Sequence, residues 1–350
     1  MNANDERLAA LYDYPMYKKL VAQHPLPKRD SSRLMVLNRI TGRREHRRFS
    51  DIVRYLKRGD ALVLNNSQVI PARLTGRRTT GGSVKILLVN DLGNGRWRVL
   101  LETRGKPRIG EEVTFGGGAV TGTLSDRLSS REWVMDFGSD NGAWKLMNQF
   151  GRMPLPPYIK RPATDTDDDP FLKEDMERYQ SVFALRPGSI AAPTAGLHFT
   201  TSLLKTLERK GVEIIYITLH VGLGTFTPIR SSDITRHRME KEHYELDTDA
   251  ARRLDMVRER GGRVFAAGST CCRVLETLAR EGGKVRASKG TTELFIHPPY
   301  RFKVVDGLLT NFHLPKTTLL VLVAAFAGRS QILDAYAEAA GKGYRFYSYG

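Results

Sequence analysis

The secondary-structure pattern of the chain changes once, and this change limits the folds that it can adopt. Between residues 61 and 140, short β-branched or alternating runs are separated by glycine-rich turns, which predicts a small antiparallel β-barrel. From about residue 141, strands alternate with helices, which is typical of a mostly parallel sheet covered by helices. The sequence therefore predicts an α/β domain, residues 1–60 and 141–350, with an inserted β-barrel domain, residues 61–140.

Single elements are predicted from apolar periodicity, capping residues and turns. Strands are expected at 32–38, 83–90, 96–102, 212–221, 263–267 and 293–296, with the second and third joined as a hairpin. Helices are expected at 50–57, 200–210, 247–260, 270–281 and 317–328. Each of these helices closes at or near a glycine, which is the usual residue at a helix end.

The global properties of the chain exclude several classes of protein. With 350 residues, 41% of them hydrophobic and 27% charged, the chain has a globular composition. The longest apolar run, residues 319–327, is far shorter than the roughly 20 residues of a membrane-crossing helix, and we find no secretory signal. The only cysteines, Cys271 and Cys272, cannot form a disulfide scaffold or a four-ligand zinc site. We therefore expect a cytoplasmic protein without a bound metal.

Positive charge is concentrated in one stretch of the chain. The formal net charge is +17, and residues 28–78 hold fourteen Lys and Arg against four acidic residues. Such clustering favours a polyanionic partner, most simply nucleic acid, because each neutralised phosphate releases counterions. The alternative is a solvated basic face that only aids solubility.

Four clusters of Gly, Pro, Thr and His predict rigid loops that hold a ligand. They read MPLPPYIKR (153–161), APTAGLHF (192–199), HVGLGTF (220–226) and LTNFHLP (309–315). Gly lets a backbone approach a ligand closely and Pro removes conformational freedom, so this composition indicates an enzyme. The third cluster lacks the last glycine of the dinucleotide fingerprint G-x-G-x-x-G, and no P-loop sequence occurs.

Histidines and arginines in and near these clusters are candidate functional residues. His198, His220 and His313 lie inside the clusters, and histidine is the natural proton carrier near neutral pH. Each could instead be a hydrogen-bonded structural histidine. The residues that could contact a carboxylate or another anion are Tyr158, Arg161 and Arg273.

Taken in order along the chain, these clusters resemble the S-adenosylmethionine:tRNA ribosyltransferase-isomerase family of queuosine biosynthesis. The resemblance covers residues 12–350 and includes shorter motifs that stand in the same order. Besides the four clusters, these motifs are VAQHP (21–25), SRL (32–34), GD (59–60), VIPARL (69–74), YQ (179–180), LFI (294–296), VVD (304–306) and YRF (344–346).

The resemblance implies a reaction and a fold. Such transferases transfer and isomerise the ribosyl part of S-adenosylmethionine onto 7-aminomethyl-7-deazaguanine at the wobble position of tRNA, giving epoxyqueuosine-tRNA, adenine and methionine. S-adenosylmethionine is consumed as a substrate, and no cofactor is expected. The family fold is a larger α/β domain with an inserted β-barrel. The expected partners are tRNA and S-adenosylmethionine, with no membrane, and the expected state is a monomer. A catalytically inactive tRNA-binding protein is the alternative.

The implied reaction suggests roles for residues in the clusters. A base removes a proton from the 5′ carbon beside the sulfonium, and an acid helps adenine to leave. His198 and His220 are expected to carry these protons, in an order that stays open. Thr194 and Asn311 could hydrogen-bond adenine or sugar, and Arg161 could hold a carboxylate. The expected substrate-binding residues are Tyr158, Arg161, Thr194, Gly196, Phe199, Gly222, Gly224, Thr225, Arg273, Asn311 and His313.

The sequence departs from the family pattern in three places. Residues 65–68, Asn-Asn-Ser-Gln, stand where the family usually shows Asn-Asp-Thr-Arg. Pro299 replaces a usual glycine, and the usual Asp-Ala-Met tail is missing after Gly350. The four clusters are otherwise intact, so we expect activity to be retained.

Overall fold

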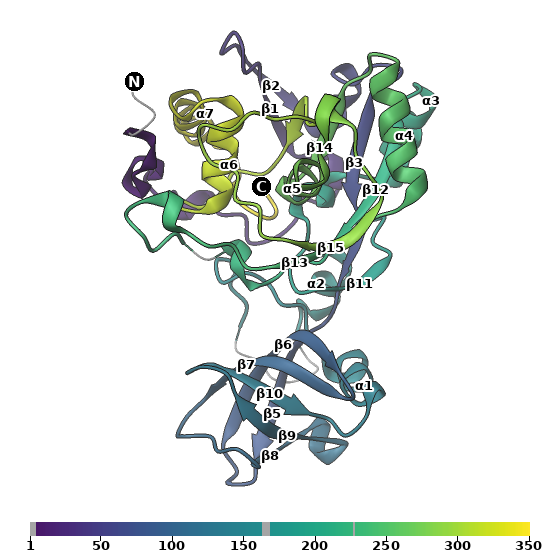
Figure 1. The fold of residues 1–350 in the computed structure, drawn as a ribbon. Coiled ribbons are helices and arrows are strands. Elements are labelled where there is room, and N and C mark those ends of the chain that lie inside the picture. The colour runs from purple at the N-terminus through teal and green to yellow at the C-terminus, as the bar shows by residue number, and fades with distance from the viewer. Residues whose placement is uncertain (1–4, 163–168, 227) are drawn as a thin grey trace.

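The computed structural model describes residues 5–162, 169–226 and 228–350, and its elements form two parts (Figure 1). The larger part holds a six-stranded sheet with its helices, and the smaller part is a closed barrel. Figure 1 shows the barrel at one end of the molecule, below the larger part. The predicted α/β fold with an inserted antiparallel β-barrel is confirmed.

The six-stranded sheet is mixed, with most of its strand pairs parallel. In order across the sheet, its strands are β15 (Ser288–Thr292), β13 (Glu242–Leu246), β12 (Glu213–Leu219), β3 (Ala61–Asn65), β14 (Val264–Ala267) and β16 (Gly307–Leu309). β12, β3, β14 and β16 pair in parallel, whereas β13 and β15 add an antiparallel edge. Parallel strands inside such a sheet are covered on both faces, which explains the continuous apolar runs in β12 and β3.

β3 lies in the centre of this sheet and not in the barrel, where the sequence pattern placed it. All five of its residues are buried: Ala61 and Val63 face one hydrophobic core, and Leu62 and Leu64 face another. A strand covered on both faces needs no alternation of apolar and polar residues, so this run looked like any other short strand. The barrel strands begin only at Arg73. The division of the chain into two domains stays a prediction.

Six antiparallel strands close the barrel. In the order of their pairing, they are β10 (Glu132–Asp136), β7 (Arg96–Thr103), β6 (Ser83–Gly93), β5 (Arg73–Arg78), β8 (Glu112–Phe115) and β9 (Val120–Arg127). β6 and β7 form the predicted hairpin, whose turn holds Asn94 and Gly95 at φ of 54° and 75°. Leu88 and Met135 are fully buried inside the barrel, and α1 (Asp140–Phe150) packs against it.

Helices cover both faces of the six-stranded sheet. The helices of the larger part are α2 (Leu172–Arg178), α3 (Thr201–Arg209), α4 (Thr248–Glu259), α5 (Ser269–Leu278), α6 (Thr318–Ala327) and α7 (Arg329–Gly341). α3 packs on the face that carries Leu62 and Leu64, while α4 and α5 pack on the opposite face. Within the described residues, no single helix has the length and hydropathy to cross a membrane. α6 and α7 reach the required length and hydropathy only when the two helices are counted together, and they meet at a bend of 112°.

Two small sheets, an antiparallel hairpin and a parallel pair, lie outside the main sheet. Their strands are β1 (Arg33–Leu37), β2 (Arg44–Arg48), β4 (Ser67–Val69) and β11 (Arg186–Ser189). The helix predicted at 50–57 is the 3-10 helix η5 (Phe49–Arg54). The strand predicted at 293–296 is wrong, because β15 pairs with β13 only as far as Thr292 and the chain then leaves the sheet.

Candidate active site

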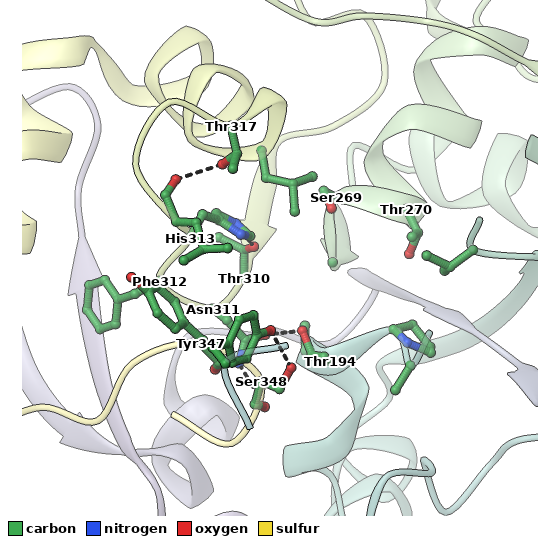
Figure 2. Close-up of a pocket in the computed structure, with 18 residues that line it drawn as sticks. Thr194, Ser269, Thr270, Thr310, Asn311, Phe312, His313, Thr317, Tyr347 and Ser348 are labelled. Carbon is green, nitrogen blue, oxygen red and sulfur yellow. Dashed lines mark hydrogen bonds between the residues drawn. The ribbon is translucent and has the colours of Figure 1, made fainter. Parts of the chain in front are cut away.

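A pocket lies at the edge of the sheet where two neighbouring parallel strands end. β14 runs into Gly268 and β16 into Thr310, and the carboxyl ends of the two strands lie side by side because they pair in parallel. The pocket comprises about 610 Å³ of space, part of it open to solvent (Figure 2). Crevices at this edge of an α/β sheet are common ligand sites.

All four sequence clusters contribute to this pocket. The first cluster supplies Tyr158 and the third supplies Val221. The second and fourth supply residues 192–195 and 310–314. The remaining lining residues are Gly268, Ser269, Thr270, Thr317, Leu319, Tyr347 and Ser348. The fold therefore brings together four segments that lie far apart in the sequence.

Asn311 joins the pocket to the C-terminal segment. Its side-chain oxygen accepts a hydrogen bond from Thr194 Oγ1 at 2.9 Å (Figure 2). Its Nδ2 donates to the carbonyl oxygens of Tyr347 and Gly350, both at 3.1 Å. Tyr347 has a φ of 66°, a left-handed conformation that is uncommon for a residue other than glycine. Thr194 and Asn311 therefore line the pocket, but their side chains are already hydrogen-bonded to other groups of the protein.

His198 lies behind Asn311 and does not line the pocket. The residue is only 8% exposed, its Nε2 lies 3.2 Å from Nδ2 of Asn311, and its ring packs against Phe49. Burial lowers the pKa of His198 to about 4, so the imidazole is neutral near pH 7. A neutral Nε2 can accept the hydrogen bond that the Asn311 amide offers.

His313 lines the pocket directly. Its Nε2 lies 2.7 Å from Thr310 Oγ1, and its main-chain N–H donates to the hydroxyl oxygen of Tyr336 at 2.9 Å. The hydroxyl of Tyr14 donates to its carbonyl oxygen. Burial lowers the pKa of His313 to about 3, so this imidazole is also neutral near pH 7.

His220 follows β12 and lies beside the small sheet of β4 and β11. Its Nδ1 lies 3.0 Å from Ser67 Oγ, the hydroxyl in the segment that departs from the family pattern. Its ring packs against Gly188, which has a φ of 141° and where a Cβ would lie 3.0 Å from the ring. Burial, and then the neighbouring His243, lower the pKa of His220. His220 does not line the pocket, but the next residue, Val221, does.

A buried ion pair fixes the glycine-rich loop after β12. The Gly222 N–H donates to Glu242 Oε1 at 3.1 Å, and Glu242 Oε2 accepts from the guanidinium of Arg273. Arg273 Nε also donates to the carbonyl oxygen of Leu294 at 3.0 Å. Both side chains of the ion pair are 5% exposed. Arg273 therefore binds a carboxylate of the protein and does not line the pocket.

Arg161 also binds a carboxylate of the protein. Its Nε and Nη2 donate to the two oxygens of Asp175 at 2.8 and 2.7 Å, and its guanidinium lies 4.9 Å from the centre of the Phe171 ring. This bidentate geometry is the one expected with a substrate carboxylate, but the partner is internal. Arg161 lies outside the pocket lining.

Aromatic rings form part of the pocket wall. The Tyr158 hydroxyl lies 2.8 Å from Ser348 Oγ, and its ring centre lies 4.9 Å from that of Tyr347. Burial raises the pKa of the Tyr158 hydroxyl, so it stays protonated near neutral pH. Tyr158 is thus placed where a ligand in the pocket would meet the face or edge of its ring.

The other expected substrate-binding residues support the loops. Phe199 is fully buried in the core, and Gly196 lies where a Cβ would approach the Phe183 ring to 3.0 Å. Gly224 lies against Glu240. The side chain of Thr225 lies outside the part of the structure that is described.

Sequence reasoning missed three groups of pocket residues, one of which is Thr317 and Leu319 at the start of α6. Gly268, Ser269 and Thr270 directly follow β14, and a signal for them was available, because polar residues after a parallel strand lie at the edge where ligands bind. Residues 347–348 carry no such signal, since their position depends on the long-range hydrogen bonds of Asn311.

The cysteines lie in the core. Cys271 and Cys272 are both fully buried, and burial raises the pKa of both thiols. Neither thiol lines the pocket. Among residues 5–162, 169–226 and 228–350, no group of three His, Cys, Asp or Glu side chains is placed to hold a metal ion.

Comparisons with known proteins identify the family. The model of the queuosine biosynthesis protein family matches residues 9–350. The S-adenosylmethionine:tRNA ribosyltransferase-isomerases of Pelotomaculum thermopropionicum and Symbiobacterium thermophilum are 49% and 48% identical to the chain, over 97% of each chain. The crystal structure of S-adenosylmethionine tRNA ribosyltransferase from Thermotoga maritima shares 37% sequence identity and a TM-score of 0.54, over 97% of this chain and 98% of its own.

These similarities extend over nearly the whole chain. The relatives are named as enzymes, which supports a transferase and not the inactive tRNA-binding protein. The identification made from the ordered motifs is confirmed by the family match. The chain therefore belongs to the S-adenosylmethionine:tRNA ribosyltransferase-isomerase family of queuosine biosynthesis.

Proposed function

We propose that this chain transfers and isomerises the ribosyl group of S-adenosylmethionine onto 7-aminomethyl-7-deazaguanine at the wobble position of tRNA. The products are epoxyqueuosine-tRNA, adenine and methionine. The observation that carries the proposal is the convergence of all four motif clusters on one pocket. This pocket is where we expect S-adenosylmethionine to react.

The chemistry of the pocket wall supports a sulfonium substrate. Among its described lining residues there is no Lys or Arg that would repel the sulfonium, and no Asp or Glu. The rings of Tyr158 and Tyr347 offer electron-rich faces, which attract cationic ligands. The same rings, with Phe312, provide flat apolar surface for adenine.

We assign the two proton transfers to His198 and His220. Burial keeps both imidazoles neutral near pH 7, the form that can take a proton from the 5′ carbon. The imidazolium formed in this step carries the proton that is then available to the departing adenine. His198 contacts Asn311, and His220 precedes Val221, and both of these neighbours line the pocket.

We propose two kinds of role for the other expected residues. Tyr158, Thr194, Asn311 and His313 line the pocket and are proposed to contact the substrate. The residues proposed to hold the surrounding loops in place are Arg161, Gly196, Phe199, Gly222, Gly224 and Arg273.

We propose that tRNA binds over the basic hairpin of β1 and β2. The Arg43 side chain at its tip is 78% exposed and is only loosely paired, with Glu45 at 3.8 Å, whereas Arg44 is paired with Glu338 at 2.6 Å. A surface ion pair as loose as that of Arg43 can give way to a phosphate. We further propose a monomer that works in the cytoplasm, where tRNA is modified, without cofactor or metal.

Release of free adenine tests the proposed function. The protein is incubated with S-adenosylmethionine and tRNA that carries 7-aminomethyl-7-deazaguanine, and adenine is quantified by chromatography. We expect one adenine for each modified tRNA and none with tRNA that carries guanine at the same position. Binding of both substrates without adenine release would contradict the proposal.

A further inference from the structure

The N-terminus of α5 opens into the pocket without a cap. The first N–H groups of a helix have no acceptor within the helix. No side chain caps α5, and among the described residues no acceptor is found for the N–H groups of Ser269 and Thr270. Gly268, at the N-cap position, has a φ of 100°, which only glycine adopts readily, and all three residues line the pocket. The helix end therefore presents free donors to the pocket.

The hydroxyl of Thr270 is a second, independent sign of a ligand. The residue is 8% exposed, and its Oγ1 has no hydrogen-bond partner among the described residues. This hydroxyl lies near the thiol of Cys271. Burial raises the pKa of that thiol and the Thr270 hydroxyl lowers it in part, but a thiol is a weak hydrogen-bond partner. An unpaired buried hydroxyl is costly, so such groups usually meet a ligand or water.

The missing partner must bring negative charge or lone pairs. The positive end of a helix dipole favours anions, and the described lining residues include no acidic side chain that could occupy this position. The neighbouring α6 differs, because Thr317 accepts a hydrogen bond from the Leu320 N–H and caps that helix. Figure 2 shows Ser269 and Thr270 on the side of the pocket away from Phe312 and His313.

We propose that the N-terminus of α5 binds the carboxylate of the methionyl group of S-adenosylmethionine. The N–H groups of Ser269 and Thr270 and the hydroxyl of Thr270 donate to the carboxylate oxygens. The proposal rests on the proposed function and names the residues that recognise one end of that substrate. A phosphate of tRNA has similar chemistry, but the buried position of Thr270 favours the small substrate.

The test compares two ligands and two proteins. Dissociation constants of S-adenosylmethionine and of its decarboxylated analogue are measured by calorimetry without tRNA, for the wild type and for Thr270→Val. Valine keeps the shape of threonine and removes the hydroxyl. We expect Thr270→Val to weaken the binding of S-adenosylmethionine about tenfold, which is the usual scale for one hydrogen bond to a charged group. The affinity for the decarboxylated analogue should stay unchanged.

Thr318→Val is the matched control. Thr318 lies in α6, is 2% exposed, and its hydroxyl also has no partner among the described residues, but it does not line the pocket. This variant should bind both ligands like the wild type. Thermal unfolding confirms that each variant is folded, and Thr270→Ala replaces Thr270→Val if the latter does not fold.

The other outcomes separate the two proposals. The carboxylate site would be overturned, and the proposed function left untouched, by either of two results. One is that the wild type and Thr270→Val bind S-adenosylmethionine with equal affinity, and the other is that Thr270→Val loses affinity equally for both ligands. A loss of tRNA affinity in Thr270→Val, measured without S-adenosylmethionine, would assign the helix end to a phosphate and overturn it as well. Wild-type protein that releases no adenine when both S-adenosylmethionine and precursor tRNA are present would instead refute the proposed function.

Discussion

His198 and Asn311 show how single residues shape the site. The buried imidazole contacts the Asn311 amide, and the same amide holds the carbonyl groups of the C-terminal segment against the pocket. Any substitution at His198 therefore changes both a proposed proton carrier and the support of a pocket residue. Variants at this position need a control for structure as well as for chemistry.

Replacing either proposed proton carrier should slow turnover. His198→Ala and His220→Ala are expected to lower the rate of adenine release by roughly 100-fold or more, the usual scale of general acid–base catalysis. Affinity for tRNA should change little, because neither residue belongs to the β1–β2 hairpin that is proposed to bind tRNA. His198→Gln and His220→Gln keep some hydrogen bonding without proton transfer. Wild-type rates in all four folded variants would redirect the assignment to Glu240, Glu242, Glu245 and His313.

Buried neutral histidines should make stability depend on pH. The pKa values of His198 and His313 in the folded protein, about 4 and about 3, lie below the unfolded value near 6.5. Their stabilising effect is complete above about pH 6.5 and is lost as the pH falls toward the folded values. Each contributes a decrease in the free energy of unfolding on the order of 1 kcal/mol per pH unit in that window.

Urea unfolding at pH 7.5, 6.5 and 5.5 measures this dependence. His313→Gln removes one titrating group and should show a shallower decline below pH 6.5 than the wild type. Parallel curves for the two proteins would mean that His313 does not remain neutral in the folded state.

The residue types in the clusters predicted which segments form the pocket. They did not predict which polar side chains are free to bind a substrate and which already bind another residue of the protein. Thr194, Asn311 and His313 were expected from their clusters, and all three line the pocket. Arg161 was expected to hold a carboxylate, and it does so with Asp175. The sequence shows a guanidinium but not its neighbour in the fold, so it could not tell an internal partner from a substrate.

At the scale of elements, the ion pair between Glu242 and Arg273 links β13 to α5. Glu242→Gln would leave the Arg273 charge buried without its partner, and we expect a loss of about 3–5 kcal/mol in the free energy of unfolding. The double variant Glu242→Gln with Arg273→Met should recover part of this loss, because it removes the uncompensated charge. Urea unfolding of the three proteins checks the expectation, and a single variant as stable as the wild type would contradict it.

The β1–β2 hairpin is the element proposed to bind tRNA. Replacing Arg43, Arg47 and Arg48 by Gln should weaken tRNA binding. The slope of log affinity against log salt should fall by up to about one for each phosphate that the variant no longer neutralises. The control replaces Arg252 and Arg260, exposed residues at the surface of α4, by Gln. An unchanged slope in the hairpin variant would place the RNA surface elsewhere.

Elements with strong periodicity or clear ends were predicted well. The helices α3, α4 and α6 lie within the ranges expected for them, and so do β12 and β14. β13 and β15, with the sequences EHYEL and SKGTT, were missed because their polar residues give no apolar run. These two strands form the antiparallel edge of the sheet, where one side need not be covered.

At the scale of the whole molecule, the sheet positions the clusters and the barrel extends away from them (Figure 1). The order of strands in the sheet could not be read from the sequence, because it depends on contacts between distant segments. β3 precedes the barrel in the chain, yet it pairs with β12 and β14 that follow it. The pocket exists only because β14 and β16 end together in this arrangement.

Removal of metal ions should leave the activity intact. The proposed reaction uses proton carriers and substrate binding and has no redox step. We expect adenine release at the wild-type rate after dialysis against EDTA, measured with substrates free of metal contaminants. A loss of activity that one specific metal restores would overturn the proposal, provided that tRNA folding is shown to be unchanged.

The transfer of ribosyl carbons tests the central claim most directly. The protein is incubated with precursor tRNA and S-adenosylmethionine that carries ¹³C in all ribosyl carbons, and the tRNA is then digested and analysed by mass spectrometry. The account predicts that the label enters the nucleoside at the wobble position and is absent from the released adenine and methionine. Transfer of an unlabelled methyl group to the tRNA, or a nucleoside without label, would contradict it.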